Sequence, residues 1–172
     1  REELLKEIEN IDFELIKSLY ENTKKELKTS DAKIEPIEYL DKYKLNDKYK
    51  YYEEIGKKAI KEGKLAAVTM AGGQGTRLGH KGPKGTYDIG LDSHKSLFEL
   101  LCDGLKEEGK KYGVVIPWFI MTSKENNAAT VEFFKKNKYF GYEKDKNLFF
   151  FIQGELPMVD MEGKILIGED GL

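Results

Sequence analysis

The segment that most constrains the fold is an apolar run that opens directly into a glycine-rich loop, within residues 65–91. Residues 65–70 are apolar and end just before Gly72, which is typical of a buried strand in a parallel sheet. Ligands of such sheets bind outside the carboxyl ends of the strands. We therefore expect the loop, which carries Arg77 and Lys84, to lie at a ligand-binding crevice.

The composition of this loop indicates a polyphosphate ligand. Glycines lack a Cβ atom, so their backbone N–H groups can approach phosphate oxygens without steric conflict. The loop glycines are Gly72, Gly73, Gly75 and Gly79. Arg77 adds a planar bidentate donor and Lys84 a compact ammonium charge. The alternative is that both are ordinary surface charges in a chain with 35% charged residues.

Two common phosphate-binding motifs do not fit this spacing. A Walker loop requires Gly, four residues and then Gly-Lys-Ser/Thr, and no lysine of the chain meets that requirement. A dinucleotide-binding loop requires GxGxxG and an acidic residue about twenty residues later, after a second strand. Here Gly73, Gly75 and Gly79 give GxGxxxG, and no such acidic residue follows.

The loop resembles the signature of the UDP-sugar pyrophosphorylases, in particular the UDP-N-acetylhexosamine branch. The signature is residues 72–79 (GGQGTRLG), followed after three residues by 83–85 (PKG). The similarity continues in residues 87–91 (YDIGL), 95–98 (KSLF), 118–123 (WFIMTS), 139–141 (YFG) and 149–157 (FFFIQGELP). The UDP-glucose enzymes usually carry serine and methionine at the positions of Arg77 and Leu78, which favours the N-acetylhexosamine branch.

The resemblance implies a fold and a reaction. The fold is α/β: a Rossmann-like nucleotidyltransferase fold of the glycosyltransferase-A type, mostly a parallel sheet with helices on both faces, preceded by N-terminal helices. The reaction converts UTP and a sugar 1-phosphate, with N-acetylglucosamine 1-phosphate expected first, into UDP-sugar and pyrophosphate with Mg²⁺. Glucose or galactose 1-phosphate are alternative substrates, and a UTP-binding module without transferase activity is an alternative function. The resemblance places the Mg²⁺ ligands outside this chain.

The same resemblance implies roles for individual residues. Arg77 is expected to hold the β- and γ-phosphates, and Lys84 to face the α-phosphate; these are the candidate catalytic residues. The residues expected to bind the nucleotide are Ala71, Gly72, Gly73, Gly75, Thr76 and Gln153. Gln153 matches a family glutamine that hydrogen-bonds the uracil edge, which suits an amide because it both donates and accepts. A buried glutamine that satisfies a neighbouring backbone group is the alternative.

Other polar residues near the motif have structural interpretations. Thr122 or Ser123 either caps the helix that follows or faces the nucleotide. His80 and His94 lack metal-ligand spacing to each other or to Cys102, so we interpret both as loop residues. The sequence therefore predicts no metal ligand in this chain.

Helical periodicity precedes the loop, and strand–helix alternation follows it. We assign residues 1–63 to a helical segment that packs on the catalytic domain, and residues 64–172 to the first, incomplete part of that nucleotide-binding domain. The predicted elements are helices within 4–19 (with Asp12 as an internal cap), 50–62, 96–111 and 127–136, strands at 65–70, 114–120 and 148–152, and a hairpin at 159–167. Because the chain stops where the resemblance places a further uridine-binding segment, we expect it to be inactive alone.

Composition restricts the partners and the compartment. With 172 residues and 40% hydrophobic content, the chain can bury one core. A net charge of -2, with lysines scattered among glutamates, argues against nucleic-acid binding. Cys102 has no second cysteine to pair with and is expected to be a buried thiol. Without an apolar stretch of membrane-spanning length, we expect a cytoplasmic protein, and we expect it to be a monomer. The resemblance implies UTP and a sugar 1-phosphate as its partners.

Overall fold

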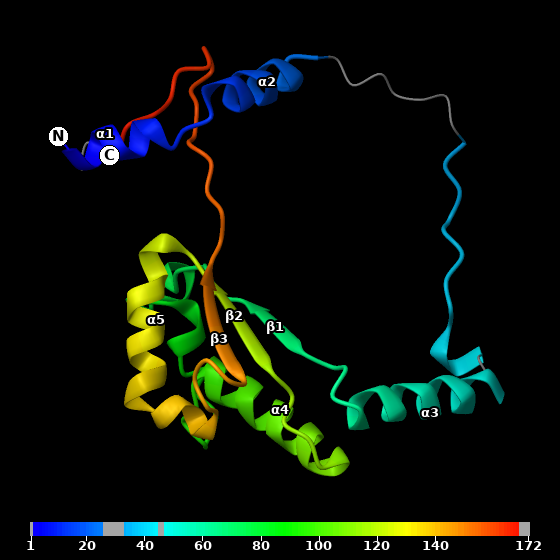
Figure 1. Cartoon of the computed structure of the whole chain (residues 1–172). Helices are drawn as coiled ribbons and strands as arrows, with labels where there is room; N and C mark the ends of the chain where they lie inside the picture. The colour runs from blue at the N-terminus through cyan, green and yellow to red at the C-terminus, as the bar shows by residue number, and fades with distance from the viewer. Residues whose placement is uncertain (1, 26–32, 45–46, 169–172) are drawn as a thin grey trace. The chain divides into compact units, whose positions relative to one another are not determined.

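The computed structural model describes residues 2–25, 33–44 and 47–168. Its helices, strands and short 3₁₀ turns (η) are α1 (Glu2–Glu9), α2 (Phe13–Thr23), η1 (Lys42–Lys44), α3 (Asp47–Lys61), β1 (Ala67–Met70), η2 (Thr76–Leu78), η3 (Lys84–Thr86), α4 (Leu97–Tyr112), β2 (Trp118–Thr122), α5 (Lys124–Lys136), η4 (Lys138–Gly141) and β3 (Leu148–Ile152) (Figure 1). The chain forms two compact units: a terminal unit of residues 1–38 and 154–172, and a sheet unit of residues 39–153. The domain boundary that we place at residue 63 lies inside the sheet unit and stays a prediction.

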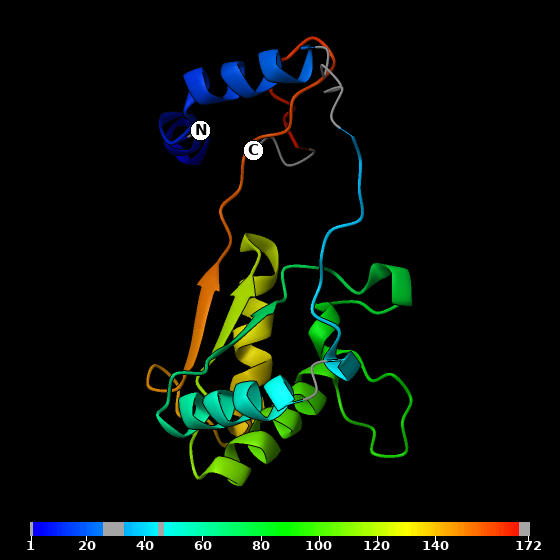
Figure 2. The ribbon, with the colours of Figure 1, turned by 90° about the vertical axis from the view of Figure 1, so that its right-hand side faces the viewer.

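The sheet unit is built on three parallel strands in the order β1-β2-β3, whose arrows point the same way (Figure 2). Trp118 of β2 pairs with Ala67 on one side and with Leu148 on the other. Since parallel neighbours cannot be joined by a hairpin, the chain crosses back through α4 and then through α5. The α/β class and the parallel sheet expected from the sequence are confirmed.

The core of the sheet unit lies between the sheet and helices α4 and α5. Trp118 and Ile120 of β2 are fully buried there, together with Phe98 of α4 and Phe134 of α5. The aromatic rings meet edge to face, with centroids 4.9 Å apart for Phe98 and Phe134 and 5.5 Å apart for Trp118 and Phe134. The indole N–H of Trp118 donates to Thr69 Oγ1 at 2.8 Å, which ties β1 to β2.

The opposite face of the sheet carries a second row of apolar side chains. Phe119 stacks on Phe149 with ring centroids 4.7 Å apart. Val68 and Met70 on β1 belong to the same row by strand alternation and are 64% and 81% exposed. Helices α4 and α5 pack on the face that carries Trp118, and helices on both faces stay a prediction.

Local signals place the start of α4 and the ends of β3. Strand β3 spans the predicted residues, and α4 begins after Ser96, whose side chain accepts from the N–H of Glu99 in a capping box. The strand predicted at 114–120 was placed too early, because the Val114 N–H bonds to Gly109 O at the end of α4 and Pro117 has no N–H to donate.

A left-handed turn, η4, connects α5 to the chain before β3. Lys138, Tyr139 and Phe140 have φ values of 52°, 52° and 50°, a region that non-glycine residues rarely adopt. Lys106 Nζ of α4 donates to the carbonyl of Phe140. Tyr139 and Phe140 also pack against the core cluster, so tertiary contacts hold a backbone conformation that the local sequence does not favour.

The terminal unit joins α1 and α2 to residues 154–168. Asp12 caps α2 by accepting from the Leu15 N–H at 2.9 Å, as predicted. Residues 159–167 form a turn closed by one antiparallel bridge, between Val159 and Ile165, in place of the two strands of a regular hairpin. Tyr20 of α2 donates to Met161 O at 2.7 Å and fastens the turn to the helix.

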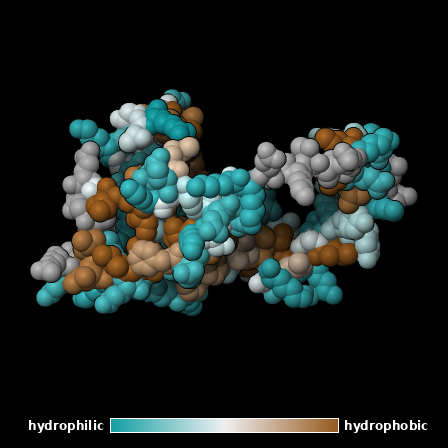
Figure 3. All heavy atoms as spheres, turned by 90° about the horizontal axis from the view of Figure 1, so that it is seen from above, coloured by the Kyte–Doolittle hydropathy of each residue, from teal (hydrophilic) through white to brown (hydrophobic). Residues whose placement is uncertain are grey.

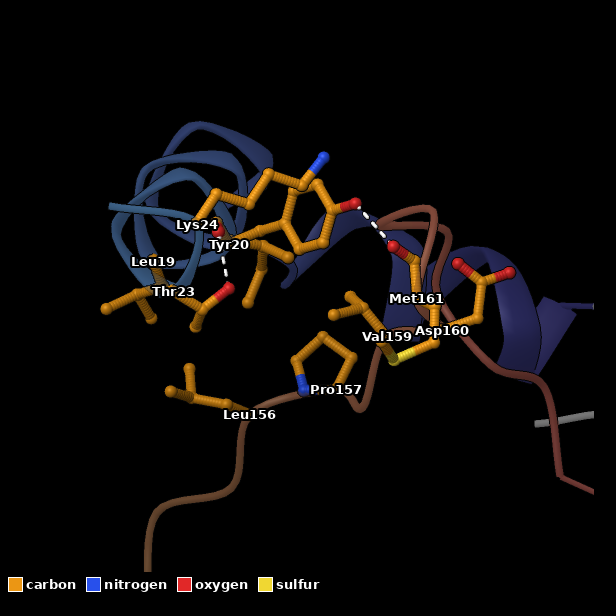
Figure 4. A pocket seen from close by; sticks show the side chains of 10 residues that line it. Leu19, Tyr20, Thr23, Lys24, Leu156, Pro157, Val159, Asp160 and Met161 are labelled. Atoms are coloured by element: carbon orange, nitrogen blue, oxygen red, sulfur yellow. Dashed lines mark hydrogen bonds between the residues drawn. The ribbon is translucent and has the colours of Figure 1, made fainter. Parts of the chain in front are cut away.

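A cavity of about 430 Å³ lies within the terminal unit, between α2 and the segment that follows residue 154 (Figure 4). It is lined by Ile16, Leu19, Tyr20, Thr23, Lys24, Leu156, Pro157, Val159, Asp160 and Met161. The ammonium group of Lys24 lies 4.2 Å from the centroid of the Tyr20 ring. None of the site residues predicted from the sequence lines this cavity.

Hydrophobic side chains interrupt the hydrophilic surface in many places (Figure 3). The extended segment at residues 33–40 is an example, because Ile34 is 97% and Ile37 is 86% exposed. Among the described residues, no helix combines the length and the apolar character needed to cross a membrane.

Candidate functional site

The predicted site residues meet at the carboxyl edge of the sheet. Directly after β1, the Ala71 N–H donates to Met121 O at 2.7 Å. Directly after β3, the Gln153 N–H donates to Thr122 O at 2.8 Å. The glycine-rich loop, the start of α5 and Gln153 therefore begin side by side, as expected for ligand binding at the end of parallel strands.

The loop folds back on itself as two arms, which we define as residues 72–79 and 82–86. The Gly75 N–H donates to Gly82 O at 2.9 Å, and the Lys84 N–H donates to Gly73 O at 3.0 Å. The first arm ends in the η2 turn, where Gly79 has a φ of 68°. These bonds give the loop a defined shape before any ligand binds.

Arg77 and Lys84 lie on different arms of this loop. Both side chains are exposed, Arg77 in η2 and Lys84 at the start of η3. Across residues 2–25, 33–44 and 47–168, neither forms an ion pair. Two cations without carboxylate partners on a glycine-rich loop suit a ligand with several negative charges.

The first arm also presents backbone donors. Within the described part of the chain, no backbone acceptor is paired with the N–H groups of Gly72, Gly73 or Thr76. Successive free N–H groups in a glycine-rich turn form an anion-binding concavity. The residues predicted to bind the nucleotide are therefore brought together with the two cations.

Two residues at the start of α5 form hydrogen bonds with the loop. Asn126, which is 1% exposed, donates from Nδ2 to Gly72 O at 2.7 Å, and Gln74 Nε2 donates to Glu125 Oε1 at 2.7 Å. Sequence reasoning missed Glu125 and Asn126, because their partners lie more than fifty residues earlier. The available signal was a serine, Ser123, three residues before an asparagine at an expected helix start.

Ser123 caps α5, which is one of the two roles predicted for this segment. Its hydroxyl accepts from the Asn126 N–H at 3.1 Å. Thr122 is fully buried, with Oγ1 lying 2.9 Å from Asn127 Oδ1 and 3.2 Å from Phe151 O. Capping therefore explains Ser123, and internal hydrogen bonding explains Thr122.

Gln153 lies against the first arm. A Cβ atom added to Gly72 would come within 2.9 Å of Gln153 Oε1, so the glycine leaves the space that this amide occupies. Among the residues that the structure describes, none forms a hydrogen bond with the Gln153 side chain. The buried-glutamine alternative predicts such a bond, and this half-buried amide forms none within the described ranges.

Lys95, Cys102 and Asp88, which follow the loop in the sequence, have structural partners or a place in the core. Lys95 donates to Asp103, and this hydrogen bond raises the pKa of the lysine. Burial raises the pKa of the Cys102 thiol, which fits a core thiol. His94 lies 3.2 Å from Asp88 Oδ2. The pKa of Asp88 is lowered mainly by the hydrogen bond that it accepts from the Gly90 N–H, and to a smaller extent by His94.

The described residues form no cluster of metal ligands. No group of three histidine, cysteine, aspartate or glutamate side chains within the described ranges is placed to hold one. Glu125, the carboxylate bonded to the loop, already accepts from Gln74. The location of the Mg²⁺ ligands stays a prediction, because this ion commonly uses only one or two carboxylates together with substrate phosphates.

The comparisons with known proteins agree with this geometry. The sequence model of the family described as UTP–glucose-1-phosphate uridylyltransferase matches residues 12–171. The chain belongs to this family. It is 40% identical to the UDP-N-acetylglucosamine pyrophosphorylase of Saccharomyces cerevisiae over 158 residues, and 39% identical to UDP-N-acetylglucosamine diphosphorylase 2 of Arabidopsis thaliana over 183 residues. The match to the family of UDP-sugar pyrophosphorylases confirms the resemblance.

These relatives are longer than the chain. The yeast match covers 90% of this chain and 33% of the relative, and the Arabidopsis match covers 97% and 36%. The crystal structure of the uridine diphosphate N-acetylglucosamine pyrophosphorylase from Trypanosoma brucei, in complex with an inhibitor, is similar with a TM-score of 0.69 and 32% identity. That match covers 91% of this chain and 32% of the other. The chain thus spans about a third of the length of its relatives.

Proposed function

We propose that the complete protein transfers a uridylyl group from UTP to N-acetylglucosamine 1-phosphate, and that this chain supplies the UTP-binding part. The observation that carries the proposal is the placement of Arg77 and Lys84 on the two arms of a glycine loop at the carboxyl edge of the sheet, where both are exposed and form no ion pair with any described residue. The names of the relatives support the choice of sugar.

The two cations have different tasks in this proposal. The sugar phosphate oxygen attacks the α-phosphorus of UTP in line, and pyrophosphate leaves, so catalysis depends on positioning and charge stabilisation. Arg77 holds the β- and γ-phosphates, because its guanidinium can bond two oxygens at once. Lys84 faces the α-phosphate and stabilises the charge that develops as the new bond forms. The free N–H groups of Gly72, Gly73 and Thr76 hold phosphate or ribose oxygens.

Gln153 is assigned to the uracil. Its amide lies against Gly72 at the edge where β3 ends, and it has no internal hydrogen bond among the described residues. An amide matches the uracil edge because it donates to a carbonyl oxygen and accepts from the ring N–H. Ala71 and Gly75 complete the backbone wall beside the nucleotide.

Magnesium remains part of the proposal for the complete protein, where it would neutralise phosphate charge. In this proposal the residues of this chain bind and orient UTP, and the Mg²⁺ ligands come from the part of the protein outside this chain. We also propose the cytoplasm as the compartment and a monomer as the working form.

Glucose 1-phosphate is the second candidate substrate, because the matching family model is described by that sugar. The activity test is therefore pyrophosphate release by the complete protein with UTP, Mg²⁺ and a panel of sugar 1-phosphates. The panel contains N-acetylglucosamine, glucose and galactose 1-phosphate. Release with one of them names the substrate.

Lys84→Ala tests the site itself. Loss of a charge that stabilises the transition state is expected to lower kcat by about 10²–10³-fold. Lys81→Ala is the matched control, because Lys81 is an exposed lysine at the bend of the same loop. Equal turnover by wild type and Lys84→Ala would contradict the assignment. UTP binding without release for every sugar would indicate a binding module in place of a transferase.

A further inference from the structure

His80 lies at the bend between the two arms of the loop and contacts both of them. A Cβ atom added to Gly75, on the first arm, would come within 2.8 Å of His80 Cβ and 2.9 Å of Cδ2. A Cβ atom on Gly82, on the second arm, would lie 3.7 Å from His80 Nε2. The imidazole therefore rests on the backbone of one arm and extends over the other.

A chain of hydrogen bonds continues from His80 into the second arm. His80 Nε2 lies 2.7 Å from Thr86 Oγ1, and the Thr86 hydroxyl donates to Pro83 O at 2.8 Å. A hydroxyl has one proton, so Thr86 can only accept from the imidazole. Nε2 of His80 must then carry a hydrogen, which fixes the tautomer of the neutral ring.

This chain of bonds encloses the position of Lys84. Pro83 and Thr86, its two ends in the second arm, flank Lys84 on either side. Arg77 precedes His80 by three residues on the first arm. The edge of the His80 ring also meets the Tyr87 ring, with centroids 5.4 Å apart, which limits rotation of the imidazole.

We propose that His80 is a positioning residue that sets the separation of Arg77 and Lys84 by bridging Gly75 to Thr86. The inference rests on the proposed function, because a fixed separation is useful only if both cations grip one triphosphate. His80 itself touches no reacting atom. Its effect is to keep the Lys84 ammonium group facing the α-phosphate while Arg77 binds the β- and γ-phosphates.

The test compares side chains that keep or lose the Nε2 donor, in the complete protein. His80→Gln places an N–H donor near the Nε2 position, whereas His80→Leu fills similar space without one, and Thr86→Val removes the acceptor. We expect His80→Leu and Thr86→Val each to lower kcat by about 10–100-fold, the effect of a misplacement of about 1 Å, while UTP affinity measured by calorimetry falls less. His80→Gln should restore most of the turnover.

Two controls separate positioning from packing. His94→Gln changes the other histidine, which is 81% exposed, and should leave turnover unchanged. The double variant His80→Leu/Thr86→Val should lose no more than either single variant, because both remove the same bond. Nitrogen-15 NMR of labelled histidine should show the Nε2–H form for His80.

The outcomes distinguish this inference from the proposed function. If the wild-type protein neither binds UTP nor releases pyrophosphate, the proposed function is wrong and the inference falls with it. If wild type is active and His80→Leu matches it, only the inference is wrong. Equal losses for His80→Gln and His80→Leu, additive losses in the double variant, or an Nδ1–H form would each also overturn it.

Discussion

Gly85 is the point at which the second arm of the loop touches the core, and Gly85→Ala tests that contact. A Cβ atom at this position would lie 2.2 Å from Cε2 and Cζ of Phe98 and 2.7 Å from Cδ2. Carbon atoms in good contact are about 3.5–4.0 Å apart, so the ring or the turn has to move by more than about 1 Å.

The surroundings of Phe98 make that movement costly. The ring is 1% exposed and meets Trp118 and Phe134 edge to face, so it cannot swing away without displacing the centre of the core. Overpacking of a close-packed interior costs about 1–3 kcal/mol, and this overlap with three ring atoms places Gly85→Ala at the upper end, about 3 kcal/mol. Because Lys84 precedes Gly85 directly, a displaced turn should also lower activity.

The assay is urea unfolding of the complete protein, followed by circular dichroism, with Gly104→Ala as the matched control. Gly104 lies within α4 and has no atom within 4 Å of an added Cβ, and it is exposed. Alanine in an exposed helix interior stabilises by about 0.5–1 kcal/mol relative to glycine. The same substitution is thus expected to lower the free energy of unfolding at residue 85 and to raise it at residue 104.

The reasoning is refuted if Gly85→Ala unfolds at the wild-type urea concentration. A second check uses Phe98→Leu, because leucine lacks the ring atoms that the new methyl group would strike. The loss in the double variant should be smaller than the two single losses added together. Strict additivity would show that residues 85 and 98 do not touch.

The other predictions concern the nucleotide side of the loop and the response to alkali. A Cβ atom at Gly72 would lie 2.9 Å from Gln153 Oε1 and 3.3 Å from the backbone N of Ser123. We therefore expect Gly72→Ala to displace the movable end of the glutamine at a modest cost in stability. We also expect about a tenfold loss of preference for UTP over CTP, equivalent to one hydrogen bond. A preference that survives in both Gly72→Ala and Gln153→Ala would rule out the uracil assignment. Burial raises the pKa of Tyr142 to about 12 from 10.0, so the unfolded chain loses this proton first, and the stabilisation present below pH 10.0 is lost as the pH rises toward about 12. The urea midpoint of unfolding should fall less between these two pH values for Tyr142→Phe than for wild type. An equal fall in both proteins would contradict the raised pKa.

Elements whose signals are local could be predicted from the sequence. Ser96 and Glu99 form a capping box that marks the start of α4, and an apolar run with few breaks marks β3. The start of β2 could not be placed, because valines before Pro117 have high strand propensity and only the end of α4 determines that Val114 is used there. Tertiary contacts overrode propensity at that point.

The same distinction applies to the site. The glycines, Arg77 and Lys84 stand in one short stretch, so their type and spacing were enough to predict a candidate phosphate site. The side chains that hold the loop could not be predicted, since Asn126 contacts Gly72 only after the sheet has formed. His80 was interpreted as a plain loop residue because its hydroxyl partner, Thr86, is significant only once the arms are paired.

The left-handed turn at η4 is another feature that the local sequence could not predict. Gly141 alone signals a positive φ, whereas Tyr139 and Phe140 are residues for which that conformation is unfavourable. Their rings pack on the core and Lys106 bonds to the Phe140 carbonyl. Neither contact can be inferred from neighbouring residues.

The support of the loop by α5 has a consequence for how the protein acquires its site. The loop is continuous in sequence, yet Asn126 lies 54 residues after Gly72, and Gln153 follows later still. On a ribosome, the loop therefore leaves the exit tunnel well before the residues that shape it. Synthesis at about 5–20 residues per second leaves it without Asn126 for several seconds. A peptide that contains only the signature should remain without a nucleotide-binding conformation, because the motif depends on a sheet completed long after the motif itself is made.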